Sequence, residues 1–79
     1  MKSLIFGYGV TGQSFERYLK RRNISFEIYD ENIIGSNITN SLPDRKKLES
    51  YEMIYMSPGI NLKEIYTKEE FDGIPYLTD

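Results

Sequence analysis

The sequence contains no cysteine, no histidine and no tryptophan. The missing thiols and imidazoles exclude disulfides, thiol nucleophiles, the usual zinc-ligand sets and histidine acid–base catalysis. The sequence has no large excess of positive or negative charge either. It contains ten basic and twelve acidic side chains, and its formal net charge is −2. This balance provides no general attraction for nucleic acid or for an anionic membrane surface, so phosphate binding has to come from local geometry.

Long hydrophobic runs are scarce as well. The apolar run Leu4–Phe6 is too short for a signal-peptide core or a membrane span, and a glycine-rich turn follows it. We therefore expect a cytoplasmic protein that does not bind membranes. A chain of 79 residues has room for one small domain, residues 1–79, with a modest stability margin.

The first thirty residues have the pattern of a strand, a helix and a second strand. Residues 2–6 are short, apolar and stopped by glycine. Residues 11–22 have helical periodicity, with Phe15, Tyr18 and Leu19 on one face, and residues 24–29 alternate between apolar and polar side chains. This is a βαβ unit, whose two strands should be parallel.

The remaining elements complete an α/β fold. Pro75 confines the last strand to a sheet edge, because proline cannot donate to the ladder. We predict a Rossmann-like, doubly wound parallel sheet of four or five strands in the order 3-2-1-4-5. The elements expected after residue 30 are a short strand from Ile33, Ile34 and Ile38, a helix from Pro43 and Asp44 to Ser50, a strand at Met53–Met56, helical turns opened by capping boxes at 61–64 and 67–70, and a strand at Ile74–Leu77.

A glycine-rich motif, G-x-G-x-x-G at residues 7–12, joins the first strand to the first helix. Gly7 is expected to permit the tight turn, Gly9 to let a phosphate approach the backbone, and Gly12 to let helix and strand pack closely. The N–H groups and dipole of the helix N-terminus then attract the anion. A glycine turn without a ligand is the alternative.

Thr11 within this motif and two segments at strand ends carry further candidate site residues. Thr11 has a hydroxyl that either caps the helix or donates to a phosphate. Asp30 ends the second strand, where it can accept from ribose hydroxyls, accept a uracil N–H, or serve as a solvated acid in the turn 30–32. Residues 57–60, Ser-Pro-Gly-Ile, should lie beside the glycine loop, although a turn of this composition needs no ligand.

Together these segments give the chain a resemblance to a known family. Residues 4–14, LIFGYGVTGQS, resemble the opening of the MurD ligases, where G-x-G-x-T-G-x-S follows the first strand. Ile28–Asp30 resembles the end of that family's second strand, and Met56–Ile60 resembles its S-P-G-I segment. Ile74–Asp79 is similar to the strand that precedes the family's central domain. The resemblance covers essentially the whole chain.

The resemblance implies a domain that holds the UDP end of UDP-N-acetylmuramoyl-L-alanine for ATP-dependent addition of D-glutamate in peptidoglycan synthesis. Gly9, Val10 and Thr11 would then hold the diphosphate. Asp30, Glu31 and Asn32 would hold uracil, although Asn32 stands where relatives often carry a basic residue. The residues implied at the ribose and phosphate side are Ser57, Pro58, Gly59 and Ile60.

The chemistry of such a ligase is not expected in these 79 residues. They contain no lysine-bearing phosphate loop and no carboxylate cluster that suggests a magnesium site. The family binds ATP and Mg in its central domain and glutamate in its C-terminal domain, so we expect no catalytic residue, no cofactor and no metal in this chain. The alternatives are an NAD(P)-binding module of an oxidoreductase, a ligand-sensing regulatory domain, and an interaction domain without a ligand.

Overall fold

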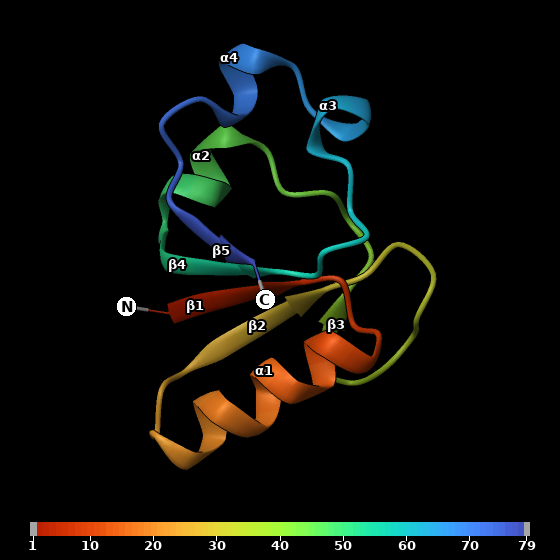
Figure 1. Ribbon diagram of the computed structural model, residues 1–79, viewed down its shortest axis with the longest axis vertical. Coiled ribbons are helices and arrows are strands. Elements are labelled where there is room, and N and C mark those ends of the chain that lie inside the picture. The colour runs from red at the N-terminus through yellow and green to blue at the C-terminus, as the bar shows by residue number, and fades with distance from the viewer. Residues whose placement is uncertain (1, 79) are drawn as a thin grey trace.

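The computed structural model describes residues 2–78, which form a five-stranded, all-parallel sheet with helices on both faces (Figure 1). Met1 and Asp79, the last residue of the predicted family resemblance, lie outside the described residues. The elements in chain order are β1 (Lys2–Phe6), α1 (Val10–Arg21), β2 (Phe26–Tyr29), β3 (Ile38–Thr39), α2 (Arg45–Glu49), β4 (Tyr51–Met56), α3 (Leu62–Ile65), α4 (Lys68–Phe71) and β5 (Tyr76–Thr78).

The strand order is β3-β2-β1-β4-β5, which confirms the predicted doubly wound, Rossmann-like topology. Phe6 at the end of β1 pairs with Tyr29 at the end of β2 and with Met56 at the end of β4. The loops that follow these three strands therefore leave the sheet at the same edge. Strand β5 is at the outer edge of the sheet, as predicted, but it begins at Tyr76 instead of Ile74, so Pro75 precedes the strand.

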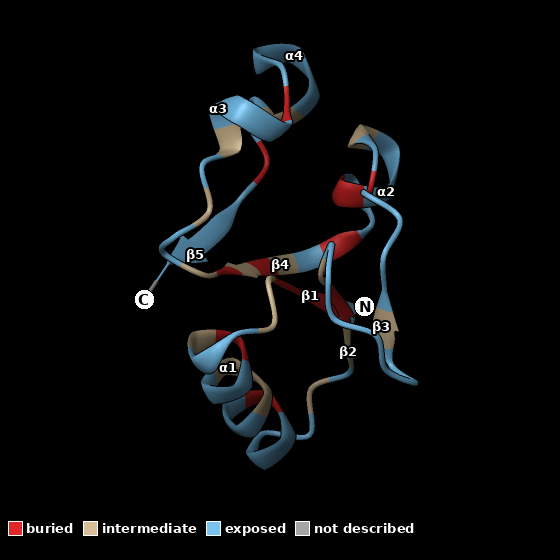
Figure 2. Ribbon diagram, turned by 90° about the vertical axis from the view of Figure 1, so that its right-hand side faces the viewer, coloured by how far each residue is buried: buried red, intermediate tan, exposed pale blue. Residues whose placement is uncertain are grey.

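The core lies on both faces of β1. Leu4, Ile5 and Phe6 are at most 1% exposed, as expected for a strand that is covered on two sides (Figure 2). On one face Ile5 packs with Leu19 of α1. On the other face Leu4 and Phe6 pack in a cluster with residues from α2 and β4 and with the segments that follow α3 and α4. No helix within residues 2–78 is long and apolar enough to cross a membrane.

Helix α1 begins one residue earlier than the sequence predicted, at Val10 instead of Thr11. Gly9 is its N-cap residue, in an extended conformation, and its carbonyl oxygen accepts the N–H of Gln13 at 3.0 Å. The alternative that Thr11 caps the helix is therefore wrong, because Thr11 already lies inside the first turn. At the other end Asn23 has a φ of 55°, the left-handed conformation that asparagine tolerates after a helix.

The prediction that Ile33 and Ile34 contribute to the third strand is wrong. Strand β3 contains Ile38 and Thr39 only, while Ile34 is 89% exposed. The cause is local, because one carboxylate oxygen of Asp30 accepts the N–H groups of both Asn32 and Ile33. These bonds bend the backbone into a turn and withdraw Ile33 N–H from any strand ladder.

Smaller differences concern the ends of elements. Strand β4 begins at Tyr51, two residues before the predicted Met53. The capping box predicted at 67–70 is complete, since Thr67 accepts the N–H of Glu70 and Glu70 accepts the N–H of Thr67. At α3 the Asn61 side chain instead accepts the N–H of Lys63.

Candidate functional site

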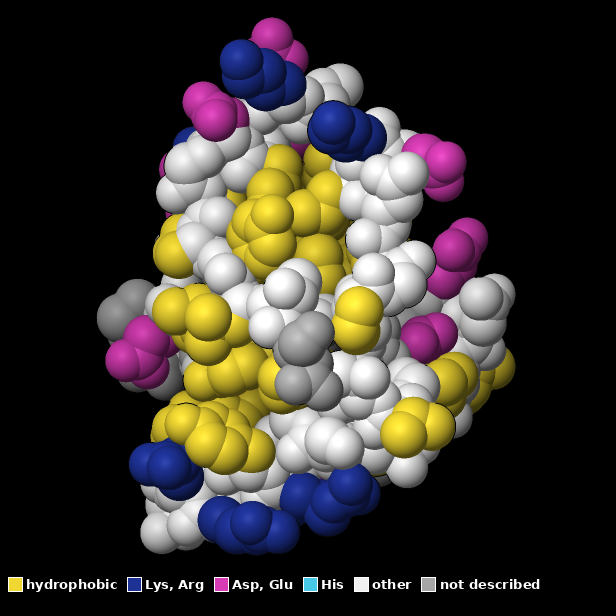
Figure 3. All heavy atoms as spheres, in the orientation of Figure 1, with side chains coloured by type: hydrophobic (Ala, Val, Ile, Leu, Met, Phe, Trp, Pro, Cys, Tyr) yellow, Lys and Arg dark blue, Asp and Glu magenta, His cyan; other side chains and the backbone are white. Residues whose placement is uncertain are grey.

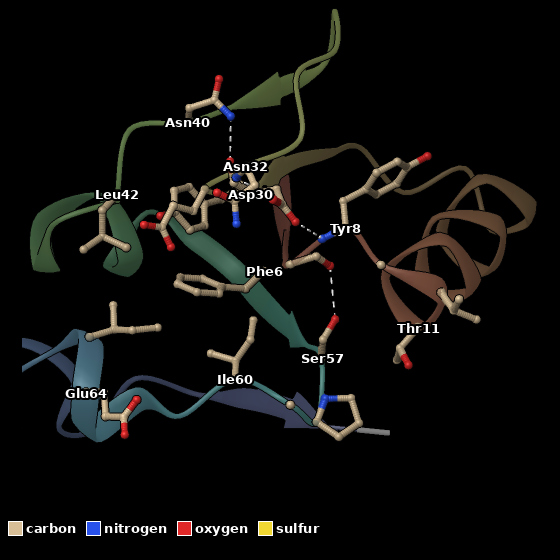
Figure 4. Close-up of a pocket in the computed structure, with 18 residues that line it drawn as sticks. Phe6, Tyr8, Thr11, Asp30, Asn32, Asn40, Leu42, Ser57, Ile60 and Glu64 are labelled. Atoms are coloured by element: carbon tan, nitrogen blue, oxygen red, sulfur yellow. Dashed lines mark hydrogen bonds between the residues drawn. The ribbon is translucent and has the colours of Figure 1, made fainter.

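A pocket of about 1000 Å³ opens at the edge of the sheet where β1, β2 and β4 end (Figure 4). This is where ligands bind in open α/β sheets, at the point where the strand order reverses. The lining residues come from the glycine loop, the turn after β2, the segment before α2, the turn after β4, and α3. They are Phe6, Gly7, Tyr8, Gly9, Val10, Thr11, Tyr29, Asp30, Glu31, Asn32, Asn40, Leu42, Ser57, Pro58, Gly59, Ile60, Glu64 and Ile65.

Two glycines of the G-x-G-x-x-G motif are required by the fold itself. Gly7 has a φ of +95°, and a Cβ there would lie 2.7 Å from Ile60 Cδ1. A Cβ on Gly12 would collide with the carbonyl oxygen of Gly7. These two glycines therefore have the turn and packing roles that the sequence predicted, and Gly12 does not line the pocket.

Two other glycines line the pocket without any such requirement. A Cβ added to Gly9 or to Gly59 would meet no atom within 4 Å, and neither residue has a positive φ. Gly9 begins α1, whereas Gly59 belongs to the turn after β4, so they contribute from separate segments to one cavity. A side chain at either position would point into open space at the pocket, so the fold itself does not require glycine there.

The N-terminus of α1 lies at the pocket, where its free N–H groups can hold an anion. Its N-cap residue is a glycine, and no side chain caps the helix. The N–H groups of the first turn, which include Val10 and Thr11, have no partner within the helix and are available to an anion. Thr11 lines the pocket in this first turn, so its hydroxyl can add a hydrogen bond to a bound phosphate.

Asp30 connects the glycine loop to the turn after β2. One carboxylate oxygen accepts the N–H of Tyr8 at 2.8 Å, and the other accepts from Asn32 and Ile33 at 2.8 and 3.0 Å. Partial burial raises the pKa of this carboxyl group, but the three N–H donors together outweigh burial and hold its pKa below the ordinary value. Asp30 is therefore an ordered, charged acceptor that holds its own turn and the glycine loop, a structural role that needs no ligand.

The turns after β1 and β4 are also joined directly. Ser57 donates its hydroxyl to the carbonyl oxygen of Gly7 at 3.1 Å, and its backbone N–H donates to Phe6 at 3.2 Å. Ile60 donates its N–H back to Ser57. These bonds hold the Ser-Pro-Gly-Ile turn beside the glycine loop, where the sequence placed it.

Side-chain charge at the pocket is negative. Asp30, Glu31 and Glu64 line it, while none of its eighteen described lining residues is lysine or arginine. Figure 3 shows acidic side chains at the right-hand side, where these strands end, and basic side chains mainly at the bottom, over α1, and at the top. An anion in this pocket therefore depends on backbone N–H groups and the helix dipole, because no cationic side chain is available.

The structure brings all ten predicted substrate-binding residues to this one pocket. Sequence reasoning did not identify several other lining residues, which are Phe6, Tyr8, Tyr29, Asn40, Leu42, Glu64 and Ile65. The sequence could have indicated Leu42 as a candidate, because it is an isolated apolar residue in a polar stretch directly before a proline. Ile65 carried none, since its position depends on how α3 folds back over the sheet.

Within residues 2–78, no group of three or more histidine, cysteine, aspartate or glutamate side chains is arranged to hold a metal ion. No protein-family model, curated protein or solved structure matches this chain.

Proposed function

We propose that this chain is the UDP-binding domain of a UDP-N-acetylmuramoyl-L-alanine–D-glutamate ligase, and that its pocket holds the UDP end of that substrate. The diphosphate lies against Gly9, Val10 and Thr11, at the N-terminus of α1. The uridine lies toward the turn at Asp30, and the turn at Ser57 faces the ribose and phosphates. The setting of this activity is the cytoplasm.

The observation that carries the proposal is the pair of open glycines, Gly9 and Gly59, on the two turns that border the pocket. A phosphate that approaches backbone N–H groups needs the space that a Cβ would occupy. Neither glycine is needed for its backbone conformation, so a ligand at this place explains both. The threonine at the helix start and the Ser-Pro-Gly-Ile turn supply the resemblance to the ligase family.

The contribution of Asp30 to uracil recognition is indirect in this proposal. Its carboxylate already accepts three backbone N–H groups. A carboxylate has about four lone-pair sites, so one further N–H can still be accepted. The main effect of Asp30 is to fix the turn 30–33, whose backbone then faces the base.

Adding D-glutamate needs groups that this domain does not supply. In the proposed ligase, ATP and Mg bind in a central domain and glutamate in a C-terminal domain. We expect these 79 residues alone to release no phosphate from ATP in the presence of UDP-N-acetylmuramoyl-L-alanine and D-glutamate. Release above background in a phosphate assay would contradict this expectation.

An NAD(P)-binding module is the second candidate, and Asp30 at the end of β2 favours it, since dinucleotide folds place a ribose-binding acid there. The two candidates differ in the ranking of ligands. We would titrate the ¹⁵N-labelled chain with UDP, ADP and NAD, and follow the amide signals of Val10, Thr11, Glu31 and Gly59. The proposal requires saturable shifts with UDP that are larger than those with ADP. NAD binding more tightly than UDP would refute it.

A further inference from the structure

A second cavity, of about 630 Å³, lies between α3, α4 and β5. Of the described residues, none lines both this cavity and the pocket at the ends of β1, β2 and β4. Helix α3 borders both, because Glu64 and Ile65 line that pocket while Leu62 and Lys63 line the second cavity. Small-molecule sites have volumes of about 300–1,000 Å³, so the second cavity is large enough to be one. We call it the α4 pocket, and its apolar lining residues are Leu62, Tyr66, Phe71, Ile74 and Tyr76.

The floor of the α4 pocket is apolar and continuous with the core. Tyr66 and Ile74 are buried and belong to the core cluster on this face of the sheet. Phe71 packs against that cluster, and its ring centroid lies 5.5 Å from that of Tyr66 and 5.3 Å from that of Tyr76. Tyr76 is 46% exposed, so the row of three rings runs from the core to the surface. A hydrocarbon group that lay on this row would bury the part that is still open to solvent.

The charged side chains at the α4 pocket are mainly basic. Lys63 and Lys68 line it together with one acid, Asp72. The ion pairs within residues 2–78 involve neither lysine. Figure 3 shows a hydrophobic hollow with basic side chains above it, over α3 and α4. The pocket at the ends of β1, β2 and β4 has the opposite character, because the charged residues that line it are all acidic.

We propose that the α4 pocket binds a small apolar carboxylate, with its hydrocarbon part on the aromatic row and its carboxylate toward Lys63 and Lys68. A single negative charge fits the lining, since two lysines and one aspartate leave an excess of one positive charge. Lysine suits this role because its flexible stem can carry the ammonium group to the anion. The inference goes beyond nucleotide binding and does not depend on it, because the two pockets share no described lining residue.

Two probes of the same shape test the preference for an anion. Phenylbutyrate carries an aromatic ring and one carboxylate, and phenylbutyramide carries the same ring and a neutral group. With the ¹⁵N-labelled chain, millimolar phenylbutyrate should give saturable shifts of the backbone N–H signals of Lys68, Phe71 and Tyr76, and leave those of Val10 and Thr11 unmoved. Phenylbutyramide should shift the same signals with an affinity about fivefold lower, which is the scale of exposed ion pairs.

Variants then measure what the lysines and the rings contribute. Lys63→Gln with Lys68→Gln should weaken phenylbutyrate binding about fivefold and leave phenylbutyramide binding within about twofold. Arg21→Gln with Lys46→Gln is the matched control, because it removes the same charge from two exposed side chains outside the α4 pocket. It should leave the binding of both probes within about twofold. Tyr76→Thr should weaken both probes to a similar extent, because it removes one ring of the row.

Several results would overturn the proposal. If phenylbutyrate gives no saturable shift around the α4 pocket, or shifts Val10 and Thr11 instead, this cavity is not a carboxylate site. If phenylbutyramide binds as tightly as phenylbutyrate, or the double lysine variant binds phenylbutyrate as well as the native chain, the lysines do not select an anion. An equal loss in the control variant would attribute the preference to net charge and not to the pocket. Circular dichroism of each variant verifies that it remains folded.

Discussion

Gly9 and Gly12 belong to one motif but lack a side chain for different physical reasons. Gly12 lies against the backbone of Gly7, which leaves no room for a Cβ. Gly9 lies at the pocket with open space around it and an ordinary negative φ of −90°. The motif therefore contains one glycine that the fold requires and one that only a ligand would require, so substitution can separate the two requirements.

We predict that Gly9→Val abolishes UDP binding and lowers the free energy of unfolding by about 1 kcal/mol or less, which is the usual scale for a helix cap. Gly12→Ala should instead lower it by about 1–3 kcal/mol, as overpacking does. Urea denaturation measures the stabilities, and UDP-induced amide shifts measure binding. A folded Gly9→Val variant that still binds UDP would show that the glycine loop is not the phosphate site.

Two carboxyl groups make stability depend on acid pH. Glu27 accepts from the hydroxyl of Tyr51 at 2.7 Å and forms ion pairs with Lys2 and Lys47, and these contacts hold its pKa below the ordinary 4.5. The pKa of Asp30 also lies below its ordinary value of 3.8. A carboxyl group whose pKa is lower in the folded chain stabilises it above the unfolded value, and this stabilisation is lost as pH falls through the folded value.

We therefore expect the urea midpoint to stay level from pH 7 to about 5 and to fall progressively below pH 4.5, because the unfolded chain takes up protons first. Glu27→Gln should have a lower midpoint at pH 7 and a smaller fall between pH 5 and pH 3. Glu49→Gln is the control, since Glu49 is an exposed acid that pairs only with Arg45 in the described chain. An equally steep acid decline in native chain and Glu27→Gln would exclude Glu27 as a cause.

At the scale of elements, the wall of the pocket depends on short helices held by tertiary contacts. Helix α3 has four residues, too few to be stable by itself. The residue that ends it, Tyr66, is 6% exposed, and its hydroxyl donates to the carbonyl oxygen of Pro43 at 2.6 Å. This bond joins the end of α3 to the segment before α2, and so connects the two segments that carry Ile65 and Leu42.

We predict that Tyr66→Phe lowers the free energy of unfolding by about 1–2 kcal/mol, because it leaves a buried carbonyl oxygen without its donor. It should also weaken UDP binding, since the two segments of the pocket wall that carry Leu42 and Ile65 are no longer joined. Tyr76→Phe is the control, because Tyr76 is 46% exposed and should change stability by less than about 0.5 kcal/mol. Chemical denaturation that cannot distinguish the two variants would show that the bond contributes nothing.

The elements that could be predicted from the sequence are those whose periodicity and termini agree. Strand β1 and the sheet order follow from an apolar run, a glycine motif and a proline directly before the edge strand. The error at Ile33 and Ile34 arose because the Asp30 side chain accepts the backbone N–H groups of Asn32 and Ile33 and bends the chain into a turn. Strand propensity contains no information on such a side-chain competitor. The presence of Leu42 and Ile65 in one pocket was not predictable either, because it depends on the tertiary position of α3.

At the scale of the whole molecule, ligand binding and stability are linked because the domain is small. A chain of 79 residues buries only about 60–65% of the surface that it exposes when unfolded, so its free energy of unfolding is modest. The pocket lies where the turns after β1, β2 and β4 meet, and α3 closes one side. A ligand that binds there contacts segments from most of the chain, and only the folded state brings them together.

We therefore predict a thermal shift that depends on ligand identity. Free UDP at ten times its Kd should add about 1.4 kcal/mol to the free energy of unfolding, which corresponds to a rise in Tm of about 6–11 °C for a domain of this size. ADP at the same concentration should give a smaller rise, and pyrophosphate a smaller one still, because pyrophosphate has no base or ribose to fill the rest of the pocket. Gly9→Val should show no rise with any of the three, because a branched side chain then occupies the phosphate position. A larger rise with NAD than with UDP, or an equal rise in native chain and Gly9→Val, would contradict the assignment of this pocket to a uridine nucleotide.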